Sequence, residues 1–130
     1  MDCIFCKIVS GEIPSYTIYE DDIVKVFLDI NPNVNGHMLI ISKNHYTNLL
    51  DIPIDVLNHI NLISKKMYKL LSSKLNVEGL TLVQNNECSQ EVLHYHLHLI
   101  PRYKNDNIKE IFPKDNLKPV ERIYNKLVQK

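Results

Sequence analysis

The longest regular pattern of hydrophobic residues runs over residues 53–75 and predicts a helix. Its apolar side chains follow spacings of three and four residues, while Lys65, Lys66 and Lys69 fall on the opposite face. We expect this helix to pack against the core and to carry no chemistry of its own. Its apolar positions are Leu57, Ile60, Ile63, Met67, Leu70 and Leu71.

Shorter apolar runs, bounded by turn residues, predict five strands. The turn at Asp21 and Asp22 joins the first two of them as a hairpin. The run at 37–41 is apolar enough for a strand in the middle of a sheet. The predicted strands cover residues 16–20, 23–28, 37–41, 80–84 and 94–100.

Two shorter helices are predicted near the ends of the chain. Gly11 stops the first, at residues 3–10, and Pro119 suits the first turn of the second. Antiparallel strands with one long helix against one face indicate an α+β fold with a five-stranded sheet. We expect a single domain over residues 1–130, with a core at 3–103 and a tail at 104–130.

Charge and composition exclude several classes of function. Lys plus Arg and Asp plus Glu each number 15, so the formal net charge is zero and no basic surface for a nucleic-acid polymer is expected. No apolar run is long enough to span a membrane, and the first residues lack the pattern of a signal sequence. We therefore expect a cytoplasmic protein without a membrane partner.

The predicted strand at 94–100 is unusual because three histidines alternate with apolar residues. Successive side chains of a strand point to opposite faces, so His94, His96 and His98 are expected on one face. The long helix is then expected to cover the other, apolar face. Three explanations remain open: a polar face without a role, a metal site, and covalent catalysis by a neutral imidazole.

The chain has three cysteines, which do not make a disulfide framework, and two of them form a Cys-x-x-Cys pair. On its own, the pair Cys3 and Cys6 is compatible with a redox pair, half of a zinc site, or two unpaired thiols. A thioredoxin-like redox motif would follow a strand and begin a helix, and no such context precedes this pair.

The sequence His-Tyr-His-Leu-His-Leu-Ile at 94–100 is similar to the motif His-φ-His-φ-His-φ-φ, where φ is hydrophobic, of the histidine triad nucleotide-binding superfamily. Other segments within residues 3–103 resemble the family's recurring segments in the same order. The resemblance implies a five-stranded sheet that pairs in a homodimer to form a larger sheet. The other segments are 4–8, 26–32, 36–41 with Lys43 and His45, 84–86 and 100–102.

The resemblance also implies an activity, the hydrolysis of a conjugate attached to the α-phosphate of a nucleotide. The conjugate would be a phosphoramidate or a dinucleoside polyphosphate, and the product a nucleoside monophosphate. His96 would attack the phosphorus and form a nucleotidyl-histidine. His98 would contact the phosphate oxygens, and His37 would orient His96 and help with proton handling.

For the nucleotide, the resemblance assigns three polar residues and an apolar slot. Asp29 matches the acidic residue that binds the ribose hydroxyls. Asn85 and Gln90 match residues that bind near the phosphate or the leaving group. The slot is expected to favour a purine base. Its walls would be Ile4, Phe5, Ile8, Phe27 and Ile30.

Bacterial-type members of the family use the Cys-x-x-Cys pair with two histidines to bind structural zinc. By position, the ligands here would be Cys3, Cys6, His45 and His94. Two thiolates and two imidazoles make a closed tetrahedral site with no open position for catalysis. The resemblance therefore implies a structural zinc and removes His94 from phosphate binding.

The segment before the triad departs from the family pattern. The loop at 85–90 is slightly shorter than usual, and Ser89 stands where the family has glycine. Glu91 takes a position often held by serine or threonine, where a carboxylate accepts a proton but repels phosphate oxygens. These departures favour an alternative, a catalytically slow module that binds or sequesters nucleotide. A zinc or redox protein built on the Cys-x-x-Cys pair is a further alternative.

Overall fold

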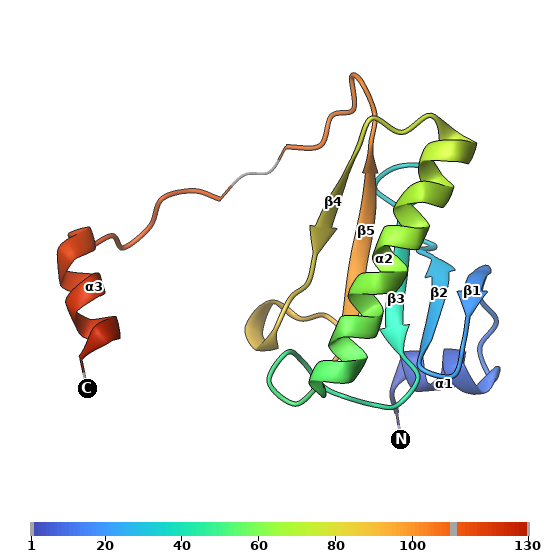
Figure 1. Cartoon of the computed structure of the whole chain (residues 1–130), viewed down its shortest axis with the longest axis horizontal. Coiled ribbons are helices and arrows are strands. Elements are labelled where there is room, and N and C mark those ends of the chain that lie inside the picture. Colours follow the sequence, from blue (N-terminus) through green and yellow to red (C-terminus); the bar gives the residue numbers. More distant parts are fainter. Residues whose placement is uncertain (1, 110–111, 130) are drawn as a thin grey trace.

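The computed structural model describes residues 2–109 and 112–129. Within them the strands form an antiparallel five-stranded sheet in the order β1-β2-β3-β5-β4, which confirms the expected α+β fold (Figure 1). The strands are β1 (Thr17–Glu20), β2 (Val24–Leu28), β3 (Met38–Ser42), β4 (Gly79–Val83) and β5 (His96–Arg102). The helices are α1 (Ile4–Ser10), α2 (Ile54–Leu75) and α3 (Val120–Val128), with a 3₁₀ turn, η1 (Glu87–Ser89).

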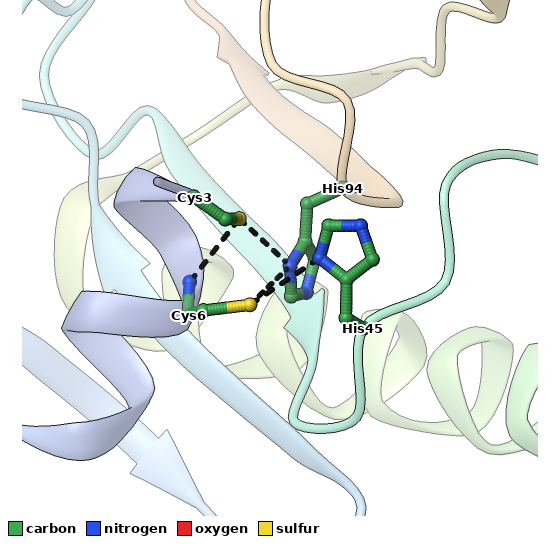
Figure 2. A group of neighbouring side chains, drawn as sticks. All are labelled: Cys3, Cys6, His45 and His94. Carbon is green, nitrogen blue, oxygen red and sulfur yellow. Dashed lines mark hydrogen bonds between the residues drawn. The ribbon is translucent and has the colours of Figure 1, made fainter. Parts of the chain in front are cut away.

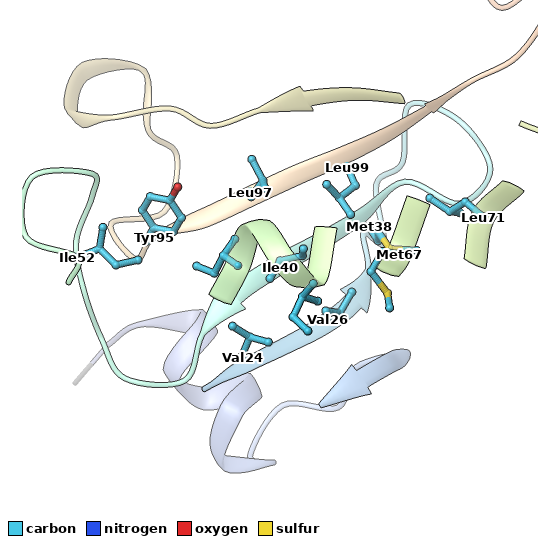
Figure 3. Close-up of a cluster of buried hydrophobic side chains, with 12 residues drawn as sticks. Val24, Val26, Met38, Ile40, Ile52, Met67, Leu71, Tyr95, Leu97 and Leu99 are labelled. Atoms are coloured by element: carbon cyan, nitrogen blue, oxygen red, sulfur yellow. The ribbon is translucent and has the colours of Figure 1, made fainter. Parts of the chain in front are cut away.

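The long helix α2 covers one face of the sheet, as its periodicity predicts (Figure 1). Leu97 and Leu99 of β5 contribute to the core beneath it, which confirms the expected assignment of the two faces. Figure 3 shows the side chains of this cluster gathered between the strands and α2. Each fully buried aliphatic side chain contributes roughly 1.5–3 kcal/mol to folding. The cluster comprises Val24, Val26, Met38, Ile40, Ile52, Ile60, Ile63, Met67, Leu71, Tyr95, Leu97 and Leu99.

The central strand β3 is buried throughout, as its continuous apolar run predicts. In its pairing with β5, Leu39 lies opposite His98 and Ile41 opposite His96. Residues directly opposite each other share a face, so the face with the two histidines also carries these two apolar side chains. They form a second cluster with Phe5 of α1, so α1 covers part of the histidine face.

The triad strand begins later than predicted. β5 starts at His96, and the chain bends through residues 91–94 before it. His94 is fully buried and its ring lies against Cys3 and Cys6, so only His96 and His98 belong to the strand itself. The alternation of faces nevertheless continues, because Phe5 contacts the rings of both His94 and His96 while Tyr95 packs in the core with Leu97. The three histidines therefore lie on one face, as expected.

Gly36 places the start of β3 against the end of α2. Its φ of +88° lies in the left-handed region that favours glycine, and a Cβ on it would be 2.9 Å from Cδ1 of Leu75. A side chain at this position would therefore push the loop away from α2. Since His37 comes next in the chain, Gly36 also determines where that ring enters the histidine face.

The chain leaves the sheet after Arg102, whose guanidinium donates two hydrogen bonds to Asp106, both 3.0 Å long. The helix predicted to begin at Pro119 is present as α3, with Pro119 as its N-cap. None of its described residues is buried, and Figure 1 shows it apart from the sheet. None of the described helices is both long and apolar enough to cross a membrane.

The β1–β2 hairpin is tied to α2 by one carboxylate. Asp21 Oδ1 accepts hydrogen bonds from the backbone N–H groups of Ile23 and Val24, at 2.8 and 2.9 Å. Its Oδ2 lies 2.7 Å from the Tyr19 hydroxyl and 2.6 Å from Nε2 of His59, on α2. Burial raises the pKa of Asp21, but the hydrogen bonds from His59, the backbone and Tyr19 outweigh it and hold that pKa well below its usual range.

We expect Asp21→Asn to lower the free energy of unfolding at neutral pH by about 1–3 kcal/mol, because an amide oxygen replaces a charged acceptor. The carboxyl pKa is depressed in the folded state, so its contribution is present above the unfolded pKa near 4 and is lost as the pH falls. Urea unfolding should therefore separate the two proteins at neutral pH, and the difference should begin to shrink below about pH 4 and disappear only when the pH falls past the depressed folded-state pKa of Asp21.

The neighbouring exposed Asp22 supplies the control, and Asp22→Asn should change the unfolding free energy by less than about 0.5 kcal/mol. Equal stability of the wild type and Asp21→Asn at neutral pH would contradict the assignment.

Candidate functional site

Two cavities meet at the histidine face, and both are lined by His96 and His98. The first, of about 400 Å³, is mainly polar, and we call it the polar cavity. The second, of about 200 Å³, is mainly apolar, and we call it the apolar cavity. Asp29 and Glu91 also line both, so these two carboxylates lie where the cavities join.

The polar cavity contains most of the polar residues that the sequence singles out. His37 and Asn85 line it, as expected, together with Asn31 and Asn33, which sequence reasoning missed. The only signal for those two asparagines is their place in a turn-rich loop, which does not reveal which way a side chain points. The lining residues are Asp29, Asn31, Asn33, His37, Val83, Asn85, Glu91, His96, His98 and Ile100.

The apolar cavity is walled by all five of the residues proposed for the base slot. They are Ile4, Phe5, Ile8, Phe27 and Ile30. The Phe5 ring makes edge contacts with Phe27 and His96, at centroid distances of 5.9 and 5.0 Å. Helix α1 thus brings an apolar wall directly against the central histidine of the triad.

The orientation of His96 follows from its hydrogen bond to the main chain. Its Nδ1 lies 2.7 Å from the carbonyl oxygen of His94. A carbonyl only accepts hydrogen bonds, so Nδ1 carries the proton, and in the neutral ring Nε2 keeps a free lone pair. This arrangement suits a nucleophile, because the reactive nitrogen is unprotonated and the ring is held from behind.

A chain of hydrogen bonds also orders the protons on the next two rings. The backbone N–H of Asn33 donates to Nδ1 of His37 at 3.2 Å, so in neutral His37 the proton is on Nε2. That Nε2 lies 3.0 Å from Nδ1 of His98, which must then accept, and the proton of neutral His98 is on its own Nε2. His98 can therefore donate a hydrogen bond from the side of the ring away from His37.

The predicted role of His37 is corrected by this geometry. His37 was expected to orient His96, but its ring contacts His98 instead, and His96 takes its orientation from the carbonyl of His94. The reason is the register of β3 and β5, which places the start of β3 beside the end of the triad that carries His98.

Both ordered rings are neutral at neutral pH. Burial lowers the pKa of His98 to about 4, with smaller contributions from His96 and His37. Burial also lowers the pKa of His37, although the nearby carboxylate of Asp29 opposes this. Neutral rings are required for the order of protons described above, so burial and hydrogen bonding lead to the same state.

Gln90 does not reach either cavity. Its amide N–H₂ donates to the carbonyl oxygen of Thr47, and its side-chain oxygen accepts the backbone N–H of Glu87 at 3.0 Å. The side chain is buried and closes the 3₁₀ turn η1. A role for Gln90 at the phosphate or leaving group does not fit this position, because its amide is turned inward to Thr47 and Glu87.

Cys3 and Cys6 of the N-terminal segment meet two histidines (Figure 2). Sγ of Cys3 lies 3.3 Å from Nδ1 of His94, and Sγ of Cys6 lies 3.3 Å from Nδ1 of His45. The ligand atoms of all four residues lie within 4.8 Å of one another. We call this group the Cys–His cluster.

The donor set of the Cys–His cluster fits a metal ion. Nε2 of His94 lies 2.7 Å from the carbonyl oxygen of Ser42, so that nitrogen carries the proton and Nδ1 offers its lone pair to the sulfurs. In the thiol state, burial and the neighbouring Cys3 raise the pKa of Cys6. A bound cation reverses that effect because it stabilises the thiolate.

A second group, formed by Asp29, His37 and His98, also lies within 4.8 Å. It suits a metal less well, because Nε2 of His37 carries the proton that it shares with His98. A cation bound there would have to displace this proton and break the contact with Asn33 or His98. The geometry therefore separates a metal-type cluster at the cysteines from a proton-ordered group in the polar cavity.

Comparison with known sequences gives the family. A sequence model of the HIT domain matches residues 10–105. An uncharacterized HIT-like protein of Methanocaldococcus jannaschii is 46% identical over 106 residues, which cover 80% of this chain and 81% of the relative. A Candida albicans relative named adenosine 5′-monophosphoramidase is 44% identical over 106 residues, which cover 77% of this chain and 70% of that protein.

Comparison with solved structures gives the same family. A HIT family protein from Bacillus anthracis matches with a TM-score of 0.85 and 35% identity, over 97% of this chain and 92% of that one. A zinc-bound histidine triad family protein from Mycobacterium smegmatis matches with a TM-score of 0.80 and 33% identity, over 88% and 85% of the two chains. Since sequence and fold agree over most of its length, the chain belongs to the HIT domain family.

Proposed function

We propose that this protein is a nucleotide phosphoramidase or related hydrolase that works through a nucleotidyl-histidine on His96. The proposal rests on the orientation of the His96 ring, which lines both the polar and the apolar cavity. The hydrogen bond from Nδ1 to the His94 carbonyl fixes this ring and leaves a free lone pair on Nε2. A nucleotide needs neighbouring sites for an apolar base and a polar phosphate, and the two cavities supply them.

Asp29 is the proposed ribose ligand because it lines both cavities. Its Oδ1 accepts the backbone N–H of Asn31 at 2.9 Å, and its Oδ2 lies 3.6 Å from Nε2 of His37. These contacts fix the carboxylate but leave lone pairs for a vicinal diol. The proposed arrangement of a purine nucleotide then has its base in the apolar cavity, its ribose at Asp29 and its α-phosphate in the polar cavity.

In the first step, Nε2 of His96 attacks the α-phosphorus, and an N–P bond forms as the bond to the leaving group breaks. The leaving group keeps the electron pair of that bond, and an amine leaving group takes up a proton from water. His98 donates its Nε2–H to a non-bridging oxygen as negative charge develops. Water then attacks the phosphorus, the bond to His96 breaks, and nucleoside monophosphate is released with the loss of one proton to solvent.

A slow nucleotide-binding module is the second candidate. It is favoured by the position of Gln90, which is turned away from the cavities, and by Glu91, whose carboxylate lies where phosphate oxygens would approach. Both candidates predict binding of adenosine monophosphate, and only turnover separates them.

We expect His96→Ala to lower the turnover of an adenosine 5′-phosphoramidate at least about a thousandfold, because no other described imidazole offers a free lone pair at the junction of the cavities. Binding of adenosine monophosphate, measured by calorimetry, should persist. Mass spectrometry after an alkaline quench should find one adenylyl group on the wild-type peptide that contains His96.

His59→Ala is the matched control, since it removes an imidazole that lines neither cavity. Its turnover should equal that of the wild type when it is assayed well below the unfolding temperature of the variant. Full activity of His96→Ala would show that another group is the nucleophile. A wild type that binds adenosine monophosphate without any turnover would favour the binding module.

We propose that the Cys–His cluster holds a structural zinc ion. Two thiolates and two imidazoles are a common zinc donor set, and four protein ligands leave no position for water. The zinc-bound mycobacterial relative supports the same choice of metal. The ion would connect α1, the end of β3 and the start of the triad through Cys3, Cys6, His45 and His94.

The purified protein is expected to contain about one zinc ion per chain by elemental analysis, and Cys6→Ser to lose it. If free zinc is about a thousandfold above its dissociation constant, its loss costs about 4 kcal/mol of stability, which thermal unfolding would detect. Cobalt in place of zinc should give the absorption of a tetrahedral thiolate complex in the wild type and not in Cys6→Ser.

Cys88→Ser is the control, because Cys88 is exposed and lies outside the cluster, so metal content and unfolding temperature should not change. Equal metal content in the wild type and Cys6→Ser would refute the ligand assignment.

We also propose a homodimer in which β4 pairs with its counterpart to extend the sheet. β4 is at one edge of the described sheet, Leu82 on it is half exposed, and the apolar side chains of α3 have no described partner.

Leu82→Arg should therefore shift the mass measured by light scattering toward the monomer. Ile18→Arg, on the opposite edge strand β1, should leave the dimer intact, and a monomeric wild type would rule the proposal out.

A further inference from the structure

Glu91 lies where three cavities meet. Besides the polar and apolar cavities, it lines a third cavity of about 630 Å³ beside the N-terminal segment, which we call the outer cavity. Among the described residues, only Glu91 lines all three. A group attached to the α-phosphate and too large for the polar cavity can therefore enter the outer cavity past this carboxylate. The outer cavity is lined by Asp2, Cys3, Ile4, His45, Thr47, Glu91, Val92 and Leu93.

The carboxylate of Glu91 is available to a ligand. The residue is exposed, and within the described part of the chain its side chain makes no hydrogen bond and no ion pair. Its chain neighbours Gln90 and Val92 do not neutralise it, because one is turned inward and the other is apolar.

The described residues that line the three cavities include no lysine and no arginine. They include three carboxylates, on Asp2, Asp29 and Glu91, and the buried ring of His37 and the half-buried ring of His98 are neutral at neutral pH. In a filled Cys–His cluster, two thiolates balance a divalent cation, so the cluster adds no net positive charge. Among the described lining residues, the carboxylates are therefore not offset by any lysine or arginine, which favours a negative potential along the path of the leaving group.

A negative potential discriminates among leaving groups. A single α-phosphate can be held by neutral donors such as the Nε2–H of His98. Further phosphates or a sulfate on the leaving group would be brought toward Glu91 and Asp2 and repelled. A leaving group that carries an ammonium would instead be attracted to the same two carboxylates.

We propose that Glu91 is a specificity-determining residue that selects nucleoside phosphoramidates whose amine leaving group carries a second, positively charged amine. The inference rests on the proposed function and names its substrate class. When the P–N bond breaks, the departing nitrogen keeps the electron pair and takes up one proton from water, which gives a neutral amine. A second proton from solvent then makes it an ammonium ion, and this new positive charge is stabilised by the carboxylate of Glu91.

The test compares two adenosine 5′-phosphoramidates of nearly equal length. One is made from 1,4-diaminobutane and ends in an ammonium, and the other is made from pentylamine and ends in a methyl group. For the wild type we expect kcat/KM to be about three- to tenfold higher with the ammonium substrate. The ratio should fall toward one as salt screens the interaction.

Glu91→Gln should bring the ratio to about one at low salt, and Glu91→Lys should invert it. Glu87→Gln is the matched control, because it removes a nearby exposed carboxylate that lines none of the three cavities, and it should keep the wild-type ratio. Thermal unfolding of each variant checks that the fold is intact.

If the wild type and Glu91→Gln show the same ratio of kcat/KM between the two substrates, the role of Glu91 is overturned and the proposed function still stands. Faster turnover of a dinucleoside polyphosphate than of the ammonium substrate would also overturn it. A wild type that turns over none of these compounds would overturn both proposals.

Discussion

The hydrogen bond from Nδ1 of His96 to the carbonyl oxygen of His94 is the contact on which the site depends. This hydrogen bond places the proton of neutral His96 on Nδ1 and leaves Nε2 with a free lone pair. The carbonyl is itself fixed, because the His94 ring is fully buried, donates to the Ser42 carbonyl and lies against the sulfurs of the Cys–His cluster. His94 thus joins the Cys–His cluster with its ring and orients His96, the proposed nucleophile, with its main chain.

This double use of His94 explains why a short helix at the start of the chain belongs to the site. Helix α1 carries Cys6, and its N-cap Cys3 accepts the backbone N–H of Cys6 through Sγ at 3.4 Å. The same helix supplies Phe5, which contacts the ring of His96 and walls the apolar cavity. A change that displaces α1 would therefore disturb the proposed base wall, the Cys–His cluster and the support of His96 together.

The sequence predicts most of the fold, because the patterns that specify strands and helices are local. The apolar stripe of α2, the buried run of β3 and the alternation around His96 and His98 each need only a few neighbouring residues to be recognised. The errors concern contacts between distant segments. The late start of β5 and the inward turn of the Gln90 amide accompany contacts with the carbonyl oxygens of Ser42 and Thr47, and a main-chain acceptor has no signature in sequence.

The proton order in the polar cavity shows how an anion can be bound without a formal positive charge. Burial keeps His37 and His98 neutral, and the chain from the Asn33 N–H through His37 leaves His98 with a proton to donate. A neutral donor binds a ground-state phosphate weakly, but its hydrogen bond becomes stronger as negative charge develops on the phosphate oxygens. A cationic side chain would bind substrate and product about equally tightly and would slow product release. The absence of lysine and arginine among the described lining residues is therefore consistent with turnover as well as with selectivity.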